Sequence, residues 1–390
     1  MKRALVLGMA RSGQSAADLL ERRGVEVVRA DRTLGNDGDT GLLDDVDVLV
    51  KSPGVPGGQL LVRVAQARGI PVWSEVELGY RLLGVELVGV TGTNGKTTTT
   101  ELLGAILGAP TAGNVGRALT GIEAEAGELV VCELSSFQLE DIDTLRCRVA
   151  VLLNLEPDHL DRHGTVEAYR DAKLRIFENQ GEDDTAVVPR GFPAVPGRGR
   201  RVEFHAGDPL PAEPRIPGAH NRENAAAATA AARALGVPDE RIAEALATFP
   251  GVPHRLELVG QRGGVRYVND SKATNVAAAR RALAAYAGDP VHLILGGSPK
   301  GEDYTPLVAA IGPNVRGVYL IGETAAELAA ALGDRPSVRA GHLAAAVSLA
   351  SAAAVEGDVV LLSPACASFD QYDDFEQRGE DFRRLVANLA

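Results

Sequence analysis

The sequence is poor in aromatic residues and in cysteine, and each scarcity excludes a class of protein. Tryptophan, tyrosine and phenylalanine make up 4% of the 390 residues, and there are three cysteines, Cys132, Cys147 and Cys366. Three widely spaced cysteines fit neither a disulfide framework nor a paired-cysteine metal site. They indicate a reducing compartment, so we expect a cytoplasmic protein.

The chain also lacks long apolar runs and an excess of positive charge. No uncharged run approaches the ~20 residues that a membrane span needs, and the N-terminal apolar run ends at Arg11, too early for a signal sequence. With 40 basic and 52 acidic residues the net charge is −12, and no basic stripe is evident. We therefore expect neither a membrane nor nucleic acid among the partners.

Lysine is scarce relative to arginine, because it supplies six of the 40 basic residues. Where lysine persists in such a background, a compact ammonium or a neutral amine can be required, and arginine supplies neither. Four of the six lysines lie within the motifs described below: Lys96, Lys173, Lys272 and Lys300. The other two, Lys2 and Lys51, lie outside them.

The length predicts two or three domains at the usual ~150 residues each. Short apolar runs alternate with helical patterns in three sets, which begin near residues 4, 86 and 265. This alternation predicts three α/β domains with mostly parallel sheets. Segment 247–257 has the composition of a linker. We therefore expect domains at 1–84, 85–251 and 252–390.

The strongest local motif is VGVTGTNGKTTTT, residues 88–100. Amide groups of a glycine-rich turn can surround a phosphate, Lys96 can neutralise it, and Thr97 can offer a hydroxyl to Mg²⁺ at the start of a helix. The loop departs from the general phosphate-loop pattern because Val90 stands where a glycine is usual. The alternative is a glycine- and threonine-rich turn that only caps a helix.

The N-terminal turn has a weaker nucleotide signal. Gly8, Ala10 and Gly13 resemble a dinucleotide fingerprint whose central glycine is replaced, and Asp31 ends the second strand where a ribose-binding acid would lie. The β-carbon of Ala10 would crowd a pyrophosphate. A plain strand–turn–helix connection and an NAD-dependent dehydrogenase are both left open at this point.

Three further residues of the middle region are candidates for metal or catalytic roles. Glu133 ends an apolar strand, where a carboxylate can hold a metal beside a triphosphate. His159 follows another strand, and Lys173 lies in a helix. Taken singly, each has an ordinary alternative: a solvated acid, a structural histidine and a surface lysine.

In the C-terminal region, three polar loops follow expected strands, at 268–275, 294–307 and 361–379. The carboxyl ends of parallel strands meet at one edge of a sheet, so we expect these loops to converge. Their polar residues could bind a small acid and a ribose: Asp270, Lys272, Thr274, Lys300 and Ser368.

Taken together, these motifs resemble the ATP-dependent Mur ligases over the whole chain. The strings that carry the resemblance stand in the family's order: GTNGKTT, AGNVG, the DH of PDHLDRH, HNRENA, PHR, NDSKATN and SPACASFDQ. The GTNGKTT loop is shared with folylpolyglutamate synthases. In contrast, ELSSFQLE, NDSKATN and SPACASFDQ are similar to the members that add D-glutamate to UDP-N-acetylmuramoyl-L-alanine.

The resemblance implies an N-terminal Rossmann-like domain that binds the UDP substrate, a central P-loop ATPase-like domain and a C-terminal Rossmann-like domain that binds the amino acid. The residues implied to contact the UDP substrate are Arg11, Ser12, Asp31, Arg32, Gly54 and Asn114. Those implied to bind ATP are Gly92, Thr93, Asn94, Gly95, Lys96, Thr97, Thr98, Asn224, Arg255 and Asp270.

The remaining implied roles concern metal, D-glutamate and catalysis. Two Mg²⁺ ions would be held by Thr97, Glu133, His159 and, if it is carbamylated, Lys173. D-glutamate would contact Thr274, Lys300, Ser368 and Phe375. The catalytic set would be Lys96, His159, Lys173 and Lys272. Carbamylation needs a neutral amine, which lysine can supply when its pKa is lowered.

The implied reaction is the ATP-dependent formation of an amide through an acyl phosphate, a cytoplasmic step in the synthesis of peptidoglycan precursors, by a monomer acting on small molecules. Three alternatives remain. One is another member of the family or a folylpolyglutamate synthase-like ligase, the second is the NAD-dependent dehydrogenase, and the third is a regulator that binds a nucleotide without catalysis.

Overall fold

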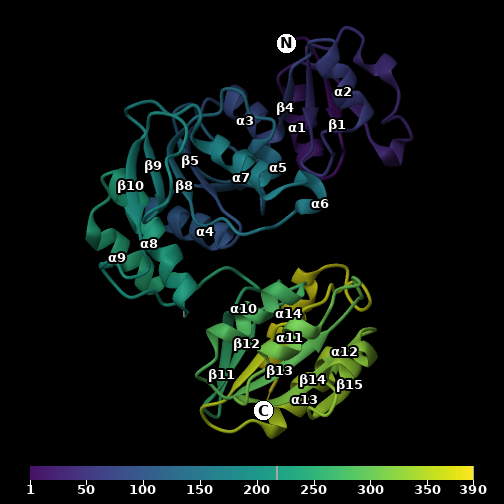
Figure 1. Cartoon of the computed structure of the whole chain (residues 1–390), viewed down its shortest axis with the longest axis vertical. Helices are drawn as coiled ribbons and strands as arrows, with labels where there is room; N and C mark the ends of the chain where they lie inside the picture. Colours follow the sequence, from purple (N-terminus) through teal and green to yellow (C-terminus); the bar gives the residue numbers. More distant parts are fainter. Residues whose placement is uncertain (217, 390) are drawn as a thin grey trace. The chain divides into compact units, whose positions relative to one another are not determined.

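The computed structural model describes residues 1–216 and 218–389, apart from the side chain of Asp161. The chain forms two compact units: Met1–Arg215 with His220–Phe249, and Ile216–Ala219 with Pro250–Ala390. Figure 1 shows three sheets, in purple, in blue to teal, and in green to yellow. The first unit holds two of them and the second unit holds the third. No helix in the described ranges is long and apolar enough to cross a membrane.

The first sheet has four parallel strands in the order β2-β1-β3-β4. They are β1 Arg3–Leu7, β2 Glu26–Ala30, β3 Val48–Lys51 and β4 Val72–Ser74, with helices α1 Arg11–Arg22, α2 Leu60–Ala67 and α3 Glu75–Leu83. Alternate residues of β1 pack into two different clusters, Leu5 and Leu7 on one face and Ala4 and Val6 on the other. Helices cover both faces, as expected for a short apolar run in a parallel sheet.

The second sheet has six parallel strands in the order β10-β9-β8-β5-β7-β6. They are β5 Glu86–Thr91, β6 Thr111–Gly113, β7 Leu129–Glu133, β8 Cys147–Leu152, β9 Thr185–Pro189 and β10 Arg200–Phe204. The helices are α4 Lys96–Leu107, α5 Ser136–Leu139, α6 Leu160–His163, α7 Val166–Leu174, α8 Ala219–Ala234 and α9 Asp239–Thr248. Strand β5 lies between β8 and β7, so the loop that follows it is flanked by the ends of both.

The third sheet has the order β11-β12-β16-β13-β14-β15, with β11 antiparallel to β12 and the other strands parallel. The strands are β11 Glu257–Arg262, β12 Val265–Asn269, β13 Val291–Gly296, β14 Val315–Ile321, β15 Ser337–Gly341 and β16 Val359–Leu362. The helices are α10 Val276–Ala285, α11 Thr305–Ala310, α12 Ala325–Leu332, α13 Leu343–Ala353 and α14 Phe375–Ala387. The predicted α/β class with three sheets is confirmed, whereas the domain boundaries stay predictions.

Candidate nucleotide and ligation site

The phosphate loop lies between β5 and α4 and depends on two glycines in backbone conformations that other residues rarely adopt. Gly92 has a φ of +151° and Gly95 a φ of +84°. A Cβ atom on Gly95 would lie 2.2 Å from Oδ1 of Asn224, a buried residue of α8. Among the described residues no side chain caps the start of α4 at Lys96, so the positive end of the helix dipole lies at this loop.

Two polar side chains that follow β8 and one from α7 hold the loop in place. Oδ1 of Asn154 accepts from the N–H of Asn94 at 2.8 Å, and Oε2 of Glu156 accepts from Nδ2 of Asn94 at 3.0 Å. The hydroxyl of Tyr169 lies 3.0 Å from Oγ1 of Thr93. Sequence analysis predicted no role for these three residues. The one feature that could have pointed to them is that they follow β8, the strand next to β5.

Two lysines approach the same point of the loop. Nζ of Lys96 donates to the carbonyl oxygens of Gly92 at 2.8 Å and Thr93 at 2.9 Å. Nζ of Lys173, from α7, also donates to the oxygen of Gly92, and it lies 4.7 Å from the centroid of the Tyr169 ring. The Lys173 side chain is 2% exposed, so it is no surface lysine. Burial, together with the charge of Lys96, lowers the pKa of Lys173 to about 7.

Glu133 is a buried carboxylate, and one of its two oxygens accepts no hydrogen bond from the described residues. It ends β7 and is 2% exposed. Oε1 accepts from Nδ2 of Asn114 at 2.9 Å, whereas Oε2 is buried and receives no hydrogen bond from the described residues. A buried oxygen without a partner costs free energy unless a ligand pairs with it. A Mg²⁺ ion fits this oxygen, and the buried hydroxyl side chain of Thr97 begins the neighbouring helix.

The donor set does not form a metal centre made of protein alone. Nowhere in the described ranges does a group of three or more His, Cys, Asp or Glu residues come together that could hold a metal ion. Mg²⁺ commonly takes one or two carboxylates and completes its ligands with water and substrate phosphates. The site therefore fits a Mg²⁺ ion that is shared between the protein and nucleotide phosphates.

His159 precedes α6 with a φ of +50°, in the left-handed region. Its ring centroid lies 4.9 Å from that of Phe137 and 6.4 Å from that of Tyr169. Nε2 lies 3.6 Å from a carboxylate oxygen of Asp158, and about half of the histidine side chain is exposed. The ring is therefore accessible to a ligand, next to the tyrosine that covers Lys173.

In the first sheet, Asp31 orders the turn that follows β1. Its Oδ2 accepts from the N–H of Met9 at 2.6 Å, and its Oδ1 accepts from the N–H and the hydroxyl of Thr33, both at 2.7 Å. These bonds, first the one from Met9, lower the pKa of Asp31. A Cβ atom on Gly13 would lie 1.8 Å from the oxygen of Gly8, so the start of α1 packs directly on the turn.

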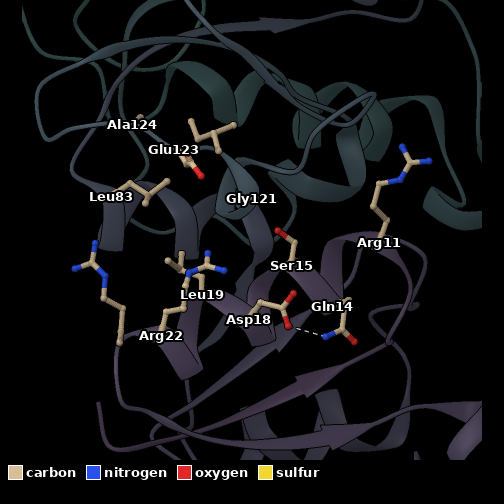
Figure 2. Close-up of a pocket in the computed structure, with 12 residues that line it drawn as sticks. Arg11, Gln14, Ser15, Asp18, Leu19, Arg22, Leu83, Gly121, Glu123 and Ala124 are labelled. Carbon is tan, nitrogen blue, oxygen red and sulfur yellow. Dashed lines mark hydrogen bonds between the residues drawn. The ribbon is translucent and has the colours of Figure 1, made fainter.

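The start of α1 also reaches the second sheet, since Nη1 of Arg11 donates to the oxygen of Gly116 at 3.2 Å. A cavity of about 740 Å³ extends from Arg11 along α1 past Ser15 and faces Gly121 (Figure 2). The other residues predicted to bind the UDP substrate do not line it: Ser12, Asp31, Arg32, Gly54 and Asn114. The structure thus brings Arg11, but not the whole predicted set, to this cavity.

In the second unit, three loops meet at the carboxyl edge of the adjacent strands β12, β16 and β13. The hydroxyl of Ser271 donates to the oxygen of Phe375 at 2.8 Å, and the N–H of Ser298 donates to the oxygen of Ala367 at 2.9 Å. These bonds join the first loop to the third, and the second loop to the third. The predicted convergence of the three loops is confirmed.

A buried arginine that sequence analysis missed holds two of these loops together. The Arg378 side chain, on α14, is 1% exposed. It donates to the hydroxyl and the oxygen of Ser271 at 2.9 and 2.8 Å, and to the oxygens of Cys366 and Ala367 at 3.2 and 3.1 Å. Burial lowers its pKa to about 10. No local pattern marks this arginine among the many others of the chain.

Asp270 is the most strongly perturbed acid at these loops. Its Oδ2 accepts from the hydroxyl of Ser363 at 2.8 Å, and burial raises its pKa to about 7 against the opposing charge of Arg255. Nζ of Lys272 lies 5.7 Å from the centroid of the Phe375 ring. The residues predicted for D-glutamate differ in exposure: Ser368 is buried, Thr274 and Phe375 are half-buried, and Lys300 is exposed.

All three cysteines are buried and free of disulfides. Burial raises the pKa of Cys147 to about 12 and raises the pKa of Cys132 and Cys366 as well. Sγ of Cys366 lies 3.4 Å from the hydroxyl oxygens of both Tyr304 and Thr324. Cys366 is therefore enclosed between the loops, and the native thiol has little nucleophilic character.

Comparison with known proteins identifies relatives over the whole chain. Residues 90–196 match the Mur ligase middle domain, and residues 254–366 match the Mur ligase glutamate ligase domain. UDP-N-acetylmuramoylalanine–D-glutamate ligase of Anaeromyxobacter dehalogenans is 42% identical, with 100% of this chain and 98% of the relative covered. The enzyme of the same name from Geobacillus kaustophilus is 41% identical with the same coverage.

A solved structure has the same fold at lower identity. The UDP-N-acetylmuramate–alanine ligase MurC of Thermotoga maritima aligns with a TM-score of 0.61, 18% identity and 99% of both chains covered. Fold, domain matches and full-length relatives agree. The chain belongs to the Mur ligase family, within the group of the UDP-N-acetylmuramoylalanine–D-glutamate ligases.

Proposed function

We propose that the protein joins the amino group of D-glutamate to the L-alanyl carboxylate of UDP-N-acetylmuramoyl-L-alanine, with conversion of ATP to ADP and phosphate. The observation that carries this proposal is the phosphate loop with two lysines on one carbonyl oxygen, beside a buried carboxylate that has an unpaired oxygen. Relatives with full coverage that bear the name of this ligase support the choice of substrates.

An amide does not form readily from a free carboxylate and an amine in water, because the carboxylate has no good leaving group. In the proposed reaction, an oxygen of the L-alanyl carboxylate attacks the γ-phosphorus of ATP, the bond to the bridging oxygen of ADP breaks, and an acyl phosphate forms. The amine of D-glutamate then attacks the acyl carbon, phosphate leaves, and the amine loses a proton.

The residues of the first unit have roles in the phosphoryl transfer. The Lys96 ammonium would balance charge that develops on the γ-phosphate, and the glycine-rich turn would orient the triphosphate. Bound Mg²⁺ would supply further neutralisation of phosphate oxygens. The residues that would hold two such ions are Thr97, Glu133, His159 and carbamylated Lys173.

Carbamylation of Lys173 is the part of the proposal that depends on a modification. The amine is buried, and its pKa of about 7 leaves a large neutral fraction at physiological pH. A neutral amine can add CO₂ with release of a proton, and the resulting carbamate is an oxygen ligand for a hard cation. Oε2 of Glu133 supports this arrangement, because it is a buried oxygen that accepts no hydrogen bond from the described residues and could bind the same kind of cation.

The second unit carries the residues proposed for the amino acid and some of those proposed for ATP. Thr274, Lys300, Ser368 and the backbone near Phe375 are proposed for D-glutamate, Lys272 for a place near the reacting groups, and Arg255 and Asp270 for ATP. The first sheet would hold the UDP substrate through Arg11, Ser12, Asp31, Arg32, Gly54 and Asn114. We expect a cytoplasmic monomer whose partners are these small molecules.

The dehydrogenase alternative has weaker support. It rests on the N-terminal turn alone, whereas the domains matched at residues 90–196 and 254–366 are those of Mur ligases. It also leaves the GTNGKTT loop without a role. A regulator that only binds a nucleotide remains distinguishable by experiment, since it would release no phosphate that depends on an added amino acid.

The deciding experiment follows ADP release by the purified chain with Mg²⁺, ATP and UDP-N-acetylmuramoyl-L-alanine while the amino acid is varied. We expect turnover with D-glutamate and little with L-glutamate, glycine or diaminopimelate. The Lys96→Ala variant is the control and should form no acyl phosphate. Absence of ATP consumption by the wild-type chain would refute the proposal. A preference for another amino acid would show that D-glutamate is not the substrate.

A further inference from the structure

The loop between β3 and α2, residues 52–59, is held by two cations through its own carbonyl oxygens. Nη1 of Arg162 donates to the oxygen of Pro53 at 2.6 Å, and Nη2 donates to the oxygen of Val55 at 3.1 Å. Nζ of Lys51 donates to the same Val55 oxygen at 3.0 Å. Arg162 and Lys51 thus both bind the backbone of this short loop.

Lys51 is buried and Arg162 is half-buried, and each is paired with an acid. The side chain of Lys51 is 1% exposed, and Nζ lies 2.8 Å from a carboxylate oxygen of Asp141. The side chain of Arg162 is 13% exposed, with Nη2 3.0 Å from Oε2 of Glu140. The guanidinium carbon lies 4.1 Å from the centroid of the Phe137 ring. The two positive and two negative side chains therefore balance each other's charge in one network.

The loop in question lies where ligands bind in open parallel sheets. It follows the carboxyl end of β3, and the hydroxyl of Ser52 donates to the oxygen of Gly8, in the turn after the neighbouring β1, at 2.6 Å. The crevice outside the carboxyl ends of such strands is the usual ligand position. A shift of loop 52–59 would therefore move one wall of that crevice.

Arg162 belongs to a short segment that also contacts the phosphate loop. Residues 154–163 follow β8, and at their start Asn154 and Glu156 hydrogen-bond to the backbone and side chain of Asn94. At their other end lies Arg162, bonded to the loop of the first sheet. One segment of ten residues thus contacts both the phosphate loop and loop 52–59.

We propose that Arg162 and Lys51 are positioning residues that fix loop 52–59, and with it the acceptor substrate, relative to the phosphate loop. This role rests on the proposed function, because only a reaction between a ligand of the first sheet and ATP needs the two held in register. Attack on a γ-phosphate tolerates little displacement, and an error of about 1 Å can cost on the order of a hundredfold in rate.

The choice of residue at each position agrees with this role. Arg162 makes three directed bonds at once, two to carbonyls and one to Glu140, which a planar fork permits. Lys51 is one of six lysines in a chain that mostly uses arginine, and its compact ammonium fits a closed space between a carbonyl and Asp141. A purely electrostatic contact would not require either geometry.

The test uses steady-state kinetics with each substrate varied in turn, on Arg162→Ala, Arg162→Lys and the double variant Lys51→Met with Asp141→Asn. The double variant avoids a buried carboxylate without its cation. Arg68→Ala is the matched control, because Arg68 forms an exposed ion pair with Asp44 in the same sheet domain. Circular dichroism and thermal unfolding establish that each variant is folded.

We expect kcat/KM for the UDP substrate to fall by about 10- to 100-fold in Arg162→Ala and in the double variant, while KM for ATP stays within about twofold. Arg162→Lys keeps the charge but cannot make all three bonds, so it should remain impaired. Hydrogen exchange should accelerate at the amides of residues 52–59 and not at those of 92–97.

Two results would overturn the role: a folded Arg162→Ala with the kcat/KM of the wild type, or an equal rise in KM for both substrates. If the wild-type chain consumes no ATP at all, the proposed function fails instead. The exchange measurement then decides the inference by itself, since unchanged exchange at residues 52–59 in Arg162→Ala would refute the fixing of the loop.

Discussion

Lys96 and Lys173 donate hydrogen bonds to the same acceptor, the carbonyl oxygen of Gly92, each over 2.8 Å. Two ammonium groups at such proximity repel each other, and the one that is more buried gives up its proton more readily. The consequence is that Lys173, which is buried, has a lowered pKa and is available as a neutral amine. Two of the six lysines of the chain thus meet at one carbonyl oxygen, that of Gly92.

The first prediction concerns the pH dependence of CO₂ uptake by Lys173. With a pKa of about 7, the amine is mostly protonated at pH 6 and mostly neutral at pH 8.5, so uptake should be absent at the lower pH and present at the higher. Carbon-13 NMR of the protein in labelled bicarbonate measures the carbamate. Lys173→Arg is the control that cannot react, and a signal that is the same at both pH values would contradict the prediction.

The second prediction concerns Gly95, where space and backbone both exclude a side chain. In Gly95→Ala the new Cβ would meet Oδ1 of Asn224 at 2.2 Å, so the loop must deform. We expect ATP affinity to fall by at least about thirtyfold, or about 2 kcal/mol, by calorimetric titration. Gly191→Ala has a comparable positive φ of +74° with open space around it, and it should bind ATP normally. Equal affinities in the two variants would argue against the steric explanation.

The third prediction concerns Arg378, the buried link between the loops of the third sheet. Arg378→Met removes the donors to the carbonyls of Ser271, Cys366 and Ala367, and the second unit should lose about 3 kcal/mol of unfolding free energy. Urea unfolding of the full chain measures this loss. Arg384→Ala, in an exposed pair on the same helix, should stay within about 0.5 kcal/mol of the wild type. Similar stability of both variants would show that the buried bonds contribute little.

The fourth prediction concerns Glu75, a buried carboxyl at the start of α3 that accepts from the N–H and the hydroxyl of Thr120. Burial raises its pKa to about 7, above its value of about 4.5 in the unfolded chain. Between these values the folded state binds more protons than the unfolded state, so the unfolding free energy falls as pH rises through this window and levels off above it.

Replacement by glutamine removes that titration and keeps an acceptor for Thr120. The stability of Glu75→Gln relative to the wild type should therefore rise between pH 4.5 and pH 8, by up to about 3 kcal/mol. Urea unfolding at several pH values measures the difference. The exposed Glu123→Gln is the control, and a parallel pH dependence of the Glu75→Gln variant and the wild type would exclude Glu75 as the source.

Local patterns were sufficient for the parts of the fold that depend on local chemistry. The four strands of the first sheet, the glycine turn before Lys96 and the convergence of the three C-terminal loops were all predicted. Each follows from apolar runs, from turn residues, or from the rule that parallel strands end at one edge. These features are encoded within a few neighbouring residues.

Two features of the fold were not predicted in full. Strand β11 was not predicted, although Gly263 and Gly264 form a two-residue turn with positive φ that is typical of a hairpin. Helix α8 begins at Ala219, before the alanine-rich run that was predicted from Asn224, and two polar residues of its first turns, Asn221 and Asn224, are buried. The first feature had a local signal that was overlooked, whereas the burial in the second is not visible in the sequence.

The candidate site likewise contains residues that were predicted from the sequence and residues that were not. Other residues of the motifs were predicted, whereas Lys51, Arg162 and Arg378 were not, because their partners include backbone carbonyls of loops. A carbonyl has no sequence signature. An arginine that binds three such groups therefore looks in the sequence like any of the other arginines.

All three thiols are buried, so the rate at which each one reacts can report when the structure around it opens. The thiolate is the group that attacks an alkylating reagent, so native Cys132, Cys147 and Cys366 should react only when the surrounding structure opens. Two of these groups lie in the first unit and one in the second, at the loops proposed for D-glutamate. The rates at which mass-tagged alkylation appears at each position would therefore report, without any engineered label, which unit opens first and how strongly each substrate keeps it closed.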